Sequence, residues 1–470
     1  MKIILINPPD KNLITGSLPE TIEEDRGVVP SLGILYIAAY LKKYTTHQIK
    51  ILDLQLEEKS QSEIQAYLIK EKPDIVGITT ITFLMIDIIQ LINLIHSTLP
   101  ETKIILGGPH VHIYPKETLR NTPADFVVLG EGEKTCLELI NNLNNKEKLK
   151  TIKGLVFKNG QQIIRNETSP FIQNLDELPP PARELTDYQK YYSSMSKKNP
   201  TTCMFTSRGC PYKCIFCDRP NLGKIFRARS AKNVVDEMEK CHKLGIKEIF
   251  VYDDTFTVDQ QRVKDICHGL LERNIKISWD IRARVNTVDQ EMLVLLKQAG
   301  CTRIHYGVEA GDNQILKNLR KGITVEMAQK AFKLTRQVGI ETAAYFMLGN
   351  PGETLKEIKK SIKLAKKLKP DYVLFSILTP YPATDIYSLA LKQGLIKKDV
   401  WQEFAENPRP EFIPPVWEEN FSRPQLVKLL KRAYRSFYLR PNYIFKQLLK
   451  IKSYDEFFKK AQIAINILKN

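Results

Sequence analysis

The sequence lacks a long hydrophobic run. Its longest uncharged apolar stretch, Ile75–Ile86, is bounded by Asp74 and Asp87 and contains three threonines. A membrane-spanning helix needs about 20 apolar residues, so none is expected. The opening residues MKIILINPPDKN contain no apolar segment of signal-peptide length and predict a strand that runs into a turn. We therefore expect a cytoplasmic protein.

Cysteine is sparse throughout, and acidic residues are sparse near the C-terminus. The chain has 8 cysteines in 470 residues, which excludes a disulfide-rich secreted scaffold. Hydrophobic residues make up 43% and charged residues 26%, as in ordinary globular proteins of several domains. Of the net charge of +17, the last fifty residues (421–470) supply most, with 12 Lys/Arg against 2 Asp/Glu. This basic end favours an anionic membrane surface or nucleic acid as partner, or is a solvated helix face.

Residues 1–145 alternate strand and helix patterns. The expected strands are Lys2–Asn7, Ile49–Leu54, Asp74–Thr79, Lys103–Gly107 and Asp125–Gly130, and helices such as Ser31–Lys43 and Phe83–His96 lie between them. The strands are apolar on both faces, which predicts a doubly wound parallel sheet with helices on both sides. Ligands of such sheets bind at the carboxyl ends of the strands. Thr79, Thr80, Gly107, Gly108, Pro109, Gly130 and Glu131 occupy those positions.

Three further regions follow. Residues 146–200 form a connector with a hairpin through Asn159-Gly160 and a stop at Pro179-Pro180-Pro181. Residues 201–395 contain six more strand–helix units, which predict a partial (β/α)6 barrel with its site at the C-terminal strand ends. The six expected strands are Thr202–Thr206, Glu248–Tyr252, Lys276–Ile281, Arg303–Val308, Thr342–Leu348 and Tyr372–Leu378. Residues 396–470 are expected to be helical, with a capping box at Ser422 and an apolar stripe over Leu426–Tyr438 that packs on the barrel or, alternatively, docks on a membrane.

Three cysteines follow the first barrel strand within eight residues. Cys210, Cys214 and Cys217 have C-x3-C-x2-C spacing, and thiolates are the usual ligands of iron–sulfur clusters. Three ligands on a four-iron cluster leave one iron open to a small molecule. Structural zinc is the competing interpretation, and it requires a fourth ligand, for which Cys203 on the preceding strand is the available residue.

This loop resembles that of the radical S-adenosylmethionine (SAM) superfamily, in which an aromatic residue, here Phe216, also precedes the last cysteine. The resemblance continues along the barrel, at Tyr252–Phe256, Gly307–Gly311, Gly349–Thr354 and Pro380–Thr384. It implies a [4Fe-4S] cluster and SAM, and a 5′-deoxyadenosyl radical that abstracts hydrogen from an unactivated carbon. It also implies that SAM is contacted by Phe216, Asp253, Asp254, Glu309 and Gly349.

The N-terminal region resembles the cobalamin-binding domain fused to one branch of this superfamily. The matching segments are Val76–Thr82, Gly107–Pro109 and Val128–Glu133. No D-x-H occurs in the chain, so the resemblance implies cobalt without a protein histidine ligand. His110 and His112 are placed to suit the nucleotide tail of cobalamin. A doubly wound domain that has lost cobalamin is the alternative.

The resemblance implies a methyl carrier, and we expect methyl transfer to a small-molecule or lipid-like substrate. A radical cyclase or rearrangement enzyme of the same branch is the first alternative. A tRNA-modifying radical enzyme would need cluster cysteines near the N-terminus, but none precedes Cys136. A non-enzymatic cobalamin or redox sensor would not need the barrel motifs. An external one-electron reductant of flavodoxin or ferredoxin type is an expected partner, the basic C-terminus suggests peripheral membrane contact, and nucleic acid is not expected.

Overall fold

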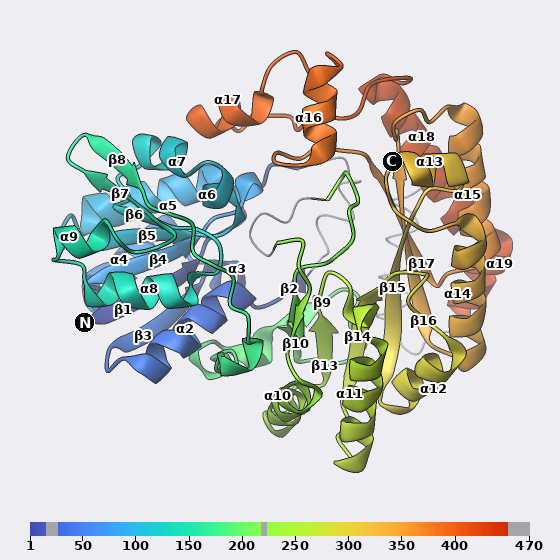
Figure 1. The fold of residues 1–470 in the computed structure, drawn as a ribbon, viewed down its shortest axis with the longest axis horizontal. Coiled ribbons are helices and arrows are strands. Elements are labelled where there is room, and N and C mark those ends of the chain that lie inside the picture. Colours follow the sequence, from blue (N-terminus) through green and yellow to red (C-terminus); the bar gives the residue numbers. More distant parts are fainter. Residues whose placement is uncertain (16–26, 218–222, 450–470) are drawn as a thin grey trace.

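The computed structural model describes residues 1–15, 27–217 and 223–449. In it two α/β halves lie side by side, the N-terminal sheet in one and the barrel sheet in the other (Figure 1). The predicted helical region continues past residue 449, and its last part lies outside the described residues. Among the residues described, no helix is long and apolar enough to cross a membrane.

The N-terminal sheet has seven strands in the order β3-β1-β4-β5-β6-β7-β8. Its five parallel strands confirm the predicted ones, and their bounds are β1 Lys2–Asn7, β3 Gln48–Asp53, β4 Ile75–Thr79, β5 Lys103–Gly107 and β6 Phe126–Val128. The predicted hairpin forms β7 (Leu155–Asn159) and β8 (Gln162–Arg165). It pairs antiparallel with β6, so part of the connector extends this sheet.

Side chains of β1 alternate between two separate cores, as a buried parallel strand requires. Ile4 and Ile6 join the core under α4 (Gln61–Glu71) and α5 (Met85–Thr98). Ile3 and Leu5 join the core under α2 (Leu32–Tyr44) and α8 (Gly132–Asn141). Helices thus cover both faces of the sheet, and the doubly wound prediction is confirmed. The remaining helices of this half are α3 (Leu54–Glu57), α6 (Pro109–Ile113), α7 (Pro115–Asn121) and α9 (Lys146–Leu149).

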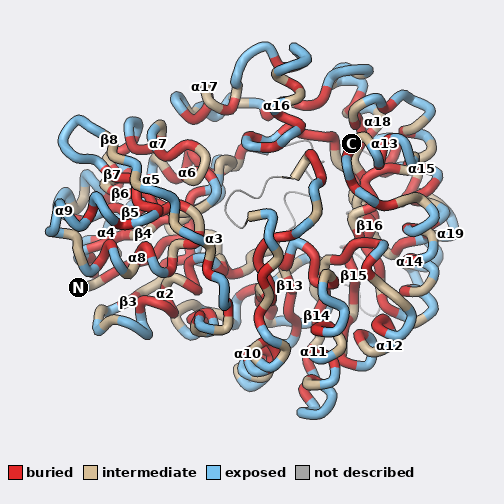
Figure 2. The backbone as a smooth tube through the Cα atoms, viewed as in Figure 1, coloured by how far each residue is buried: buried red, intermediate tan, exposed pale blue. Residues whose placement is uncertain are grey.

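All six predicted barrel strands form one parallel sheet in chain order. Their bounds are β10 Thr201–Met204, β13 Glu248–Val251, β14 Ser278–Ala283, β15 Cys301–Glu309, β16 Glu341–Leu348 and β17 Tyr372–Ile377. One face is covered by α10 (Ala231–Lys243), α11 (Gln260–Glu272), α12 (Gln290–Gln298), α14 (Val325–Val338) and α15 (Leu355–Leu368), with the short α13 (Asn313–Asn318) after β15. The buried backbone follows these layers in both halves (Figure 2).

Two short ladders and five 3-10 turns complete the connections. The ladders are β2 (Gly27–Val28) with β9 (Tyr192–Ser193) and β11 (Ser207–Arg208) with β12 (Arg227–Ala228). The 3-10 turns are η1 (Thr82–Leu84), η2 (Leu175–Glu177), η3 (Arg183–Leu185), η4 (Tyr188–Lys190) and η5 (Phe256–Val258).

The C-terminal helices close the open edge of the barrel. The capping box at Ser422 is confirmed, and α18 (Arg423–Tyr438) buries Leu426, Leu430 and Phe437 in the barrel core. The hydroxyls of Tyr434 and Tyr438 each bond both the backbone N–H and the C=O of a β17 residue, at 2.7–3.1 Å. These hydroxyls satisfy polar groups that an edge strand otherwise leaves unpaired. The apolar stripe therefore packs on the barrel, the first of the two alternatives.

Segments after the last barrel strand also reach the N-terminal half. Helices α16 (Asp385–Lys392) and α17 (Val400–Glu406) bridge the two halves (Figure 1). The amide of Asn121 on α7 donates to the backbone of Ala405 at 3.2 Å, and Gln402 donates to Glu117 at 3.0 Å. The last helix within the described residues, α19 (Pro441–Leu448), follows α18 and buries none of its residues.

Candidate active site between the two halves

The three predicted cysteines lie in the loop between β11 and β12, which follows the end of β10. Cys210 and Cys214 are buried, Cys217 is partly exposed, and none forms a disulfide. Between them, Ile215 joins an apolar cluster with Tyr114 of the N-terminal half and Ile386 of α16. The loop is thus held where the two halves meet.

A cation lies against one of the sulfurs. The Arg284 guanidinium, at the end of β14, is 3.6 Å from Sγ of Cys214 and stacks on the Tyr212 ring at 3.8 Å. It also donates to the backbone C=O of Lys321. The loop is therefore fixed to the ends of the barrel strands on the side of Cys214. Thr255 Oγ1 lies 3.6 Å from Sγ of Cys210.

The predicted fourth zinc ligand is not in the loop. Cys203 is fully buried on β10 in an apolar core, and burial raises the pKa of its thiol to about 12. Within residues 1–15, 27–217 and 223–449, no three His, Cys, Asp or Glu side chains converge as ligands of one metal ion. Ligands of a four-iron cluster bind different irons and need not converge, so the three thiols suit the cluster better than zinc.

Asp253 holds the start of the cysteine loop. Its fully buried carboxylate accepts four hydrogen bonds of 2.5–3.1 Å, from the backbone N–H and hydroxyl groups of Thr206 and Ser207. This geometry makes it a positioning residue for the segment that leads to Cys210. Asp254, next to it, is exposed.

Glu309 sits in a strained turn at the end of β15. Its φ of 68° is left-handed, which is rare for a residue with a side chain, and the β15–β16 register shifts there. Its carboxylate pairs with Lys321 at 2.6 Å, and Lys321 Nζ lies 5.7 Å from the ring centre of Phe216. The turn therefore connects the β15 end to the cysteine loop through a buried ion pair. Lys321 carried no motif by which sequence reasoning could have found it.

The end of β16 forms a compact turn around another carboxylate. Oε2 of Glu353 accepts from the backbone N–H groups of Gly349 and Asn350, at 2.8 and 2.9 Å. Oε1 of Glu353 has no hydrogen-bond partner, and burial raises the pKa of this carboxyl to about 7. Gly349, with φ of 77°, faces Leu426 of α18.

The predicted cobalamin residues meet at one edge of the N-terminal sheet. Thr80 donates to the C=O of Gly107 through both its backbone N–H and its hydroxyl, at 2.6 and 2.8 Å. A Cβ on Gly108 would lie 2.6 Å from the backbone oxygen of Thr80, so only glycine fits there. Pro109 begins α6. This close packing joins the ends of β4 and β5 into one surface, with Thr79 partly exposed on it.

Two observations fit a large ring at this edge. A Cβ on Gly130 would meet no atom within 4 Å, and one on Gly107 would meet only a carbonyl oxygen at 3.9 Å, so both present bare backbone to open space. The His110 Nε2 atom is buried without a partner, and burial lowers the pKa of this imidazole to about 3, which keeps it neutral. His112 accepts from the N–H of Gly130 at 3.1 Å and positions that turn.

The side chain of Glu131, which follows β6, is engaged by the barrel half. Its carboxylate forms buried ion pairs with Arg208 at 3.1 Å and Arg227 at 2.8 Å. Glu133 pairs with the same Arg208 at 2.5 Å, and the Arg208 guanidinium stacks on the Tyr36 ring at 5.2 Å. Arg208 and Arg227 face each other across the β11–β12 ladder. The acidic loop after β6 therefore holds the barrel segment that precedes Cys210.

The two family models that match the chain cover its two halves. They are the Radical SAM superfamily, over residues 204–365, and the B12 binding domain, over residues 21–140. A protein of Pyrococcus horikoshii named as an uncharacterized methyltransferase is 35% identical over 452 residues, which cover 95% of either chain. The anaerobic magnesium-protoporphyrin IX monomethyl ester cyclase of Rubrivivax gelatinosus is 26% identical and covers 94% of this chain and 78% of its own.

A solved structure has the same architecture. OxsB, described as a cobalamin-dependent S-adenosylmethionine radical enzyme with aqua-cobalamin and S-adenosylmethionine bound, superposes with a TM-score of 0.78 at 20% identity. The match covers 99% of this chain and 72% of that one. The chain belongs to the radical SAM superfamily, in the group that carries a B12 binding domain. It is a radical SAM enzyme, and its cofactors are a [4Fe-4S] cluster, SAM and cobalamin.

Proposed function

We propose that this enzyme transfers a methyl group to an unactivated carbon of a small-molecule or lipid-like substrate. The observation that carries the proposal is the position of the cysteine loop. Its Ile215 belongs to one apolar cluster with Tyr114 of the B12 binding domain and with residues that follow the last barrel strand. The name of the Pyrococcus horikoshii relative supports methyl transfer. When bound, the cluster and SAM supply a carbon-centred radical, and cobalamin supplies a methyl carrier.

The chain's own residues bind and orient these groups in the proposal. Cys210, Cys214 and Cys217 ligate the cluster. SAM is contacted by Phe216, Asp254, Glu309 and Gly349, and Asp253 contributes by holding the loop. Thr79, Thr80, Gly107, Gly108, Pro109 and Gly130 form the cobalamin surface. For Glu131, the ion pairs with Arg208 and Arg227 favour a role in holding the two halves together.

The first test is metal and corrinoid content. Reconstituted wild-type protein is expected to hold about four irons per chain and to retain a corrinoid spectrum after incubation with hydroxocobalamin. Cys214→Ala is expected to lose the iron, whereas Cys136→Ala, which changes a thiol buried in the N-terminal core, keeps it. Retention of the full iron content by Cys214→Ala would refute the cluster assignment.

The second test is methyl transfer itself. Reduced protein is incubated with methyl-deuterated SAM and a small-molecule extract, and products are examined by mass spectrometry. A product that carries the deuterated methyl group supports the proposal. A modified product without the label supports radical cyclisation or rearrangement, the alternative favoured by the similarity to the Rubrivivax gelatinosus cyclase.

The C-terminal surface suggests where the protein meets other partners. Exposed Lys428, Lys431, Arg432 and Arg435 of α18 line a shallow hollow of about 480 Å³. The next helix and the residue after it expose four large apolar side chains, which are Ile444, Phe445, Leu448 and Leu449. Cations alone would suit nucleic acid, but cations together with exposed apolar side chains suit an anionic membrane surface. We propose peripheral membrane contact at this surface.

Vesicle sedimentation tests the membrane contact. Wild-type protein is expected to bind vesicles of phosphatidylserine and phosphatidylcholine, and to bind pure phosphatidylcholine weakly. Lys428→Glu/Lys431→Glu is expected to lower binding about tenfold or more, while Lys330→Glu/Lys333→Glu on α14, equal in charge change, leaves it unchanged. Equal losses in both variants would refute a specific surface.

A flavodoxin- or ferredoxin-type reductant remains the proposed electron donor.

A further inference from the structure

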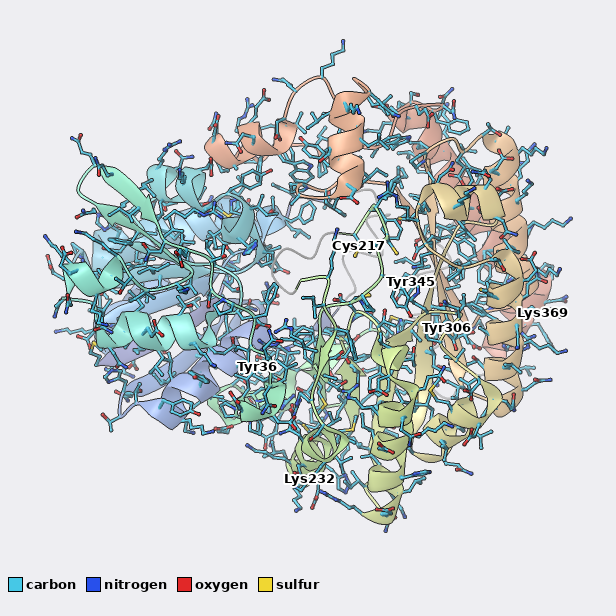
Figure 3. All side chains as sticks on the ribbon, in the orientation of Figure 1. Tyr36, Cys217, Lys232, Tyr306, Tyr345 and Lys369 are labelled. Atoms are coloured by element: carbon cyan, nitrogen blue, oxygen red, sulfur yellow. The ribbon has the colours of Figure 1, made fainter. Side chains whose placement is uncertain are left out.

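The inner face of the barrel sheet is open to solvent. On β16 and β17, Tyr345 and Ser376 point to this face and are partly exposed. Their neighbours on each strand point to the opposite face and are buried under the helices. Arg282 on β14 is partly exposed on the same face. Tyr306, by contrast, points outward and bonds Thr335 of α14 at 2.8 Å. Figure 3 shows Tyr345 on the side of the sheet toward Cys217, and Tyr306 nearer to α14.

Arg282 is the cation on this face whose charge is not matched. Its guanidinium lies 4.1 Å from the centre of the Tyr252 ring, and within the part of the chain that the structure describes it has no ion pair or hydrogen bond. The neighbouring Arg303 is paired with Asp280 at 3.8 Å and Glu341 at 3.3 Å. A partly buried charge without a counter-charge is costly unless a ligand supplies one.

Beside Arg282, a hydrogen-bonded chain fixes the hydroxyl of Tyr345. Nδ1 of His305 lies 2.7 Å from Tyr345 Oη, and Nε2 of His305 lies 3.1 Å from Asp280. Burial lowers the pKa of His305, which favours the neutral imidazole. Because the Asp280 carboxylate only accepts, we assign the ring proton to Nε2, and Nδ1 then accepts from the Tyr345 hydroxyl. The lone pairs of Tyr345 Oη remain as acceptors.

The level of Arg282 in the barrel separates it from the cysteine loop. Arg284, two residues later and just past the end of β14, is the one that reaches Sγ of Cys214. Two residues of strand span about 7 Å, so Arg282 lies one layer deeper. That position is below the level at which a ligand of the cluster would sit, on the inner face where a substrate would be held.

We propose that Arg282 binds a carboxylate or phosphate group of the substrate, and that Tyr345 accepts a hydrogen bond from a hydroxyl or amine next to it. The substrate is then an anionic metabolite or an acidic lipid headgroup that carries a hydrogen-bond donor beside the charge. This inference rests on the proposed function, because it assigns the inner face of the barrel to the substrate.

Ligand retention tests the inference without turnover. Reconstituted protein saturated with SAM is mixed with a small-molecule and lipid extract and passed through gel filtration, and the retained compounds are identified by mass spectrometry. Wild-type protein is expected to retain anionic compounds, and Arg282→Gln to retain at least about tenfold less, the usual effect of losing a charge-assisted bond. Arg320→Gln, which changes an exposed arginine at the surface, is the matched control.

Each outcome decides the question. Fragment masses distinguish carboxylates from phosphates and free metabolites from lipids. Equal retention by wild type and Arg282→Gln, or no anionic compound retained by wild type, overturns the inference. SAM affinity is measured in parallel by equilibrium dialysis, and a tenfold loss in Arg282→Gln would assign the residue to the SAM carboxylate instead. Failure of methyl transfer with retention intact would refute the proposed reaction and leave the anion site standing.

Discussion

The buried ion pairs between the two halves allow a quantitative prediction for Glu131→Gln. Glu131, Arg208 and Arg227 are each at most 7% exposed, so water contributes little to their solvation. Removing one partner of a buried ion pair costs about 3–5 kcal/mol, because the remaining charge stays buried. Glutamine keeps an acceptor for the N–H of Ile172, which Glu131 Oε2 bonds at 2.6 Å. We therefore expect the lower end, about 3 kcal/mol.

Thermal unfolding measures this cost. A loss of 3 kcal/mol corresponds to a fall in Tm of roughly 6–12 °C if each half unfolds as a cooperative unit of about 150–250 residues. The control is Glu167→Gln, which breaks an ion pair of 3.1 Å with Lys153 whose side chains are 81% and 59% exposed. Exposed pairs contribute at most about 1 kcal/mol, so its Tm should barely move.

A double variant tests whether the acidic pair acts on one target. Glu131 and Glu133 both pair with Arg208, so Glu131→Gln/Glu133→Gln leaves that guanidinium without a carboxylate. Because Arg208 lies two residues before Cys210, we expect the iron content of the double variant to fall with its Tm. Equal Tm values for Glu131→Gln and Glu167→Gln would show that the buried pairs do not hold the halves together.

Three further changes have defined outcomes. Burial raises the pKa of Glu353 from 4.5 to about 7, so between these pH values the folded state keeps a proton that the unfolded chain loses. The free energy of unfolding should therefore fall by roughly 3 kcal/mol as the pH rises from about 4.5 to 7. Urea unfolding of Glu353→Gln should lack this loss. Tyr434→Phe leaves the N–H and C=O of Phe375 unpaired, and calorimetry should show a loss of about 1–3 kcal/mol. Gly108 has a φ of 105°, and a Cβ there would lie 2.6 Å from a backbone oxygen, so Gly108→Ala should lower the free energy of unfolding in urea by about 2 kcal/mol or more. At the control position, Gly33, a Cβ would meet no atom within 4 Å, so Gly33→Ala should not lower it.

The strands and the cysteine loop could be predicted because their signals are local. Each barrel strand is a short β-branched or apolar run between helical patterns, and all six formed with ends within two residues of those expected. The spacing of Cys210, Cys214 and Cys217 is visible in the sequence itself. His305 and Tyr306 are neighbours on β15, and they bond on opposite faces of the sheet, as the two-residue period of a strand requires.

Contacts between distant segments carried no such signal. Glu131 follows a strand in a glycine-rich loop, which is the usual position of a ligand-binding residue, yet its partner Arg227 lies 96 residues further along the chain. Lys321 follows an unremarkable short helix, and its pairing with Glu309 depends on the bulge that turns that carboxylate inward. Such pairings are decided by how distant segments pack against one another, which periodicity and motif spacing do not describe.

Residues of both halves hold the cysteine loop in place. Its entry is held by Asp253 of the barrel, and its preceding ladder is held by Glu131 and Glu133 of the B12 binding domain. Its apolar middle, at Ile215, belongs to the same apolar cluster as Tyr114 of that domain. A loop supported from both sides keeps its geometry only while the halves stay docked, so order in the cysteine loop and attachment of the B12 binding domain should be lost together. A radical enzyme that must pass a group between two cofactors needs this coupling, since a shift of either half would misplace the reacting groups.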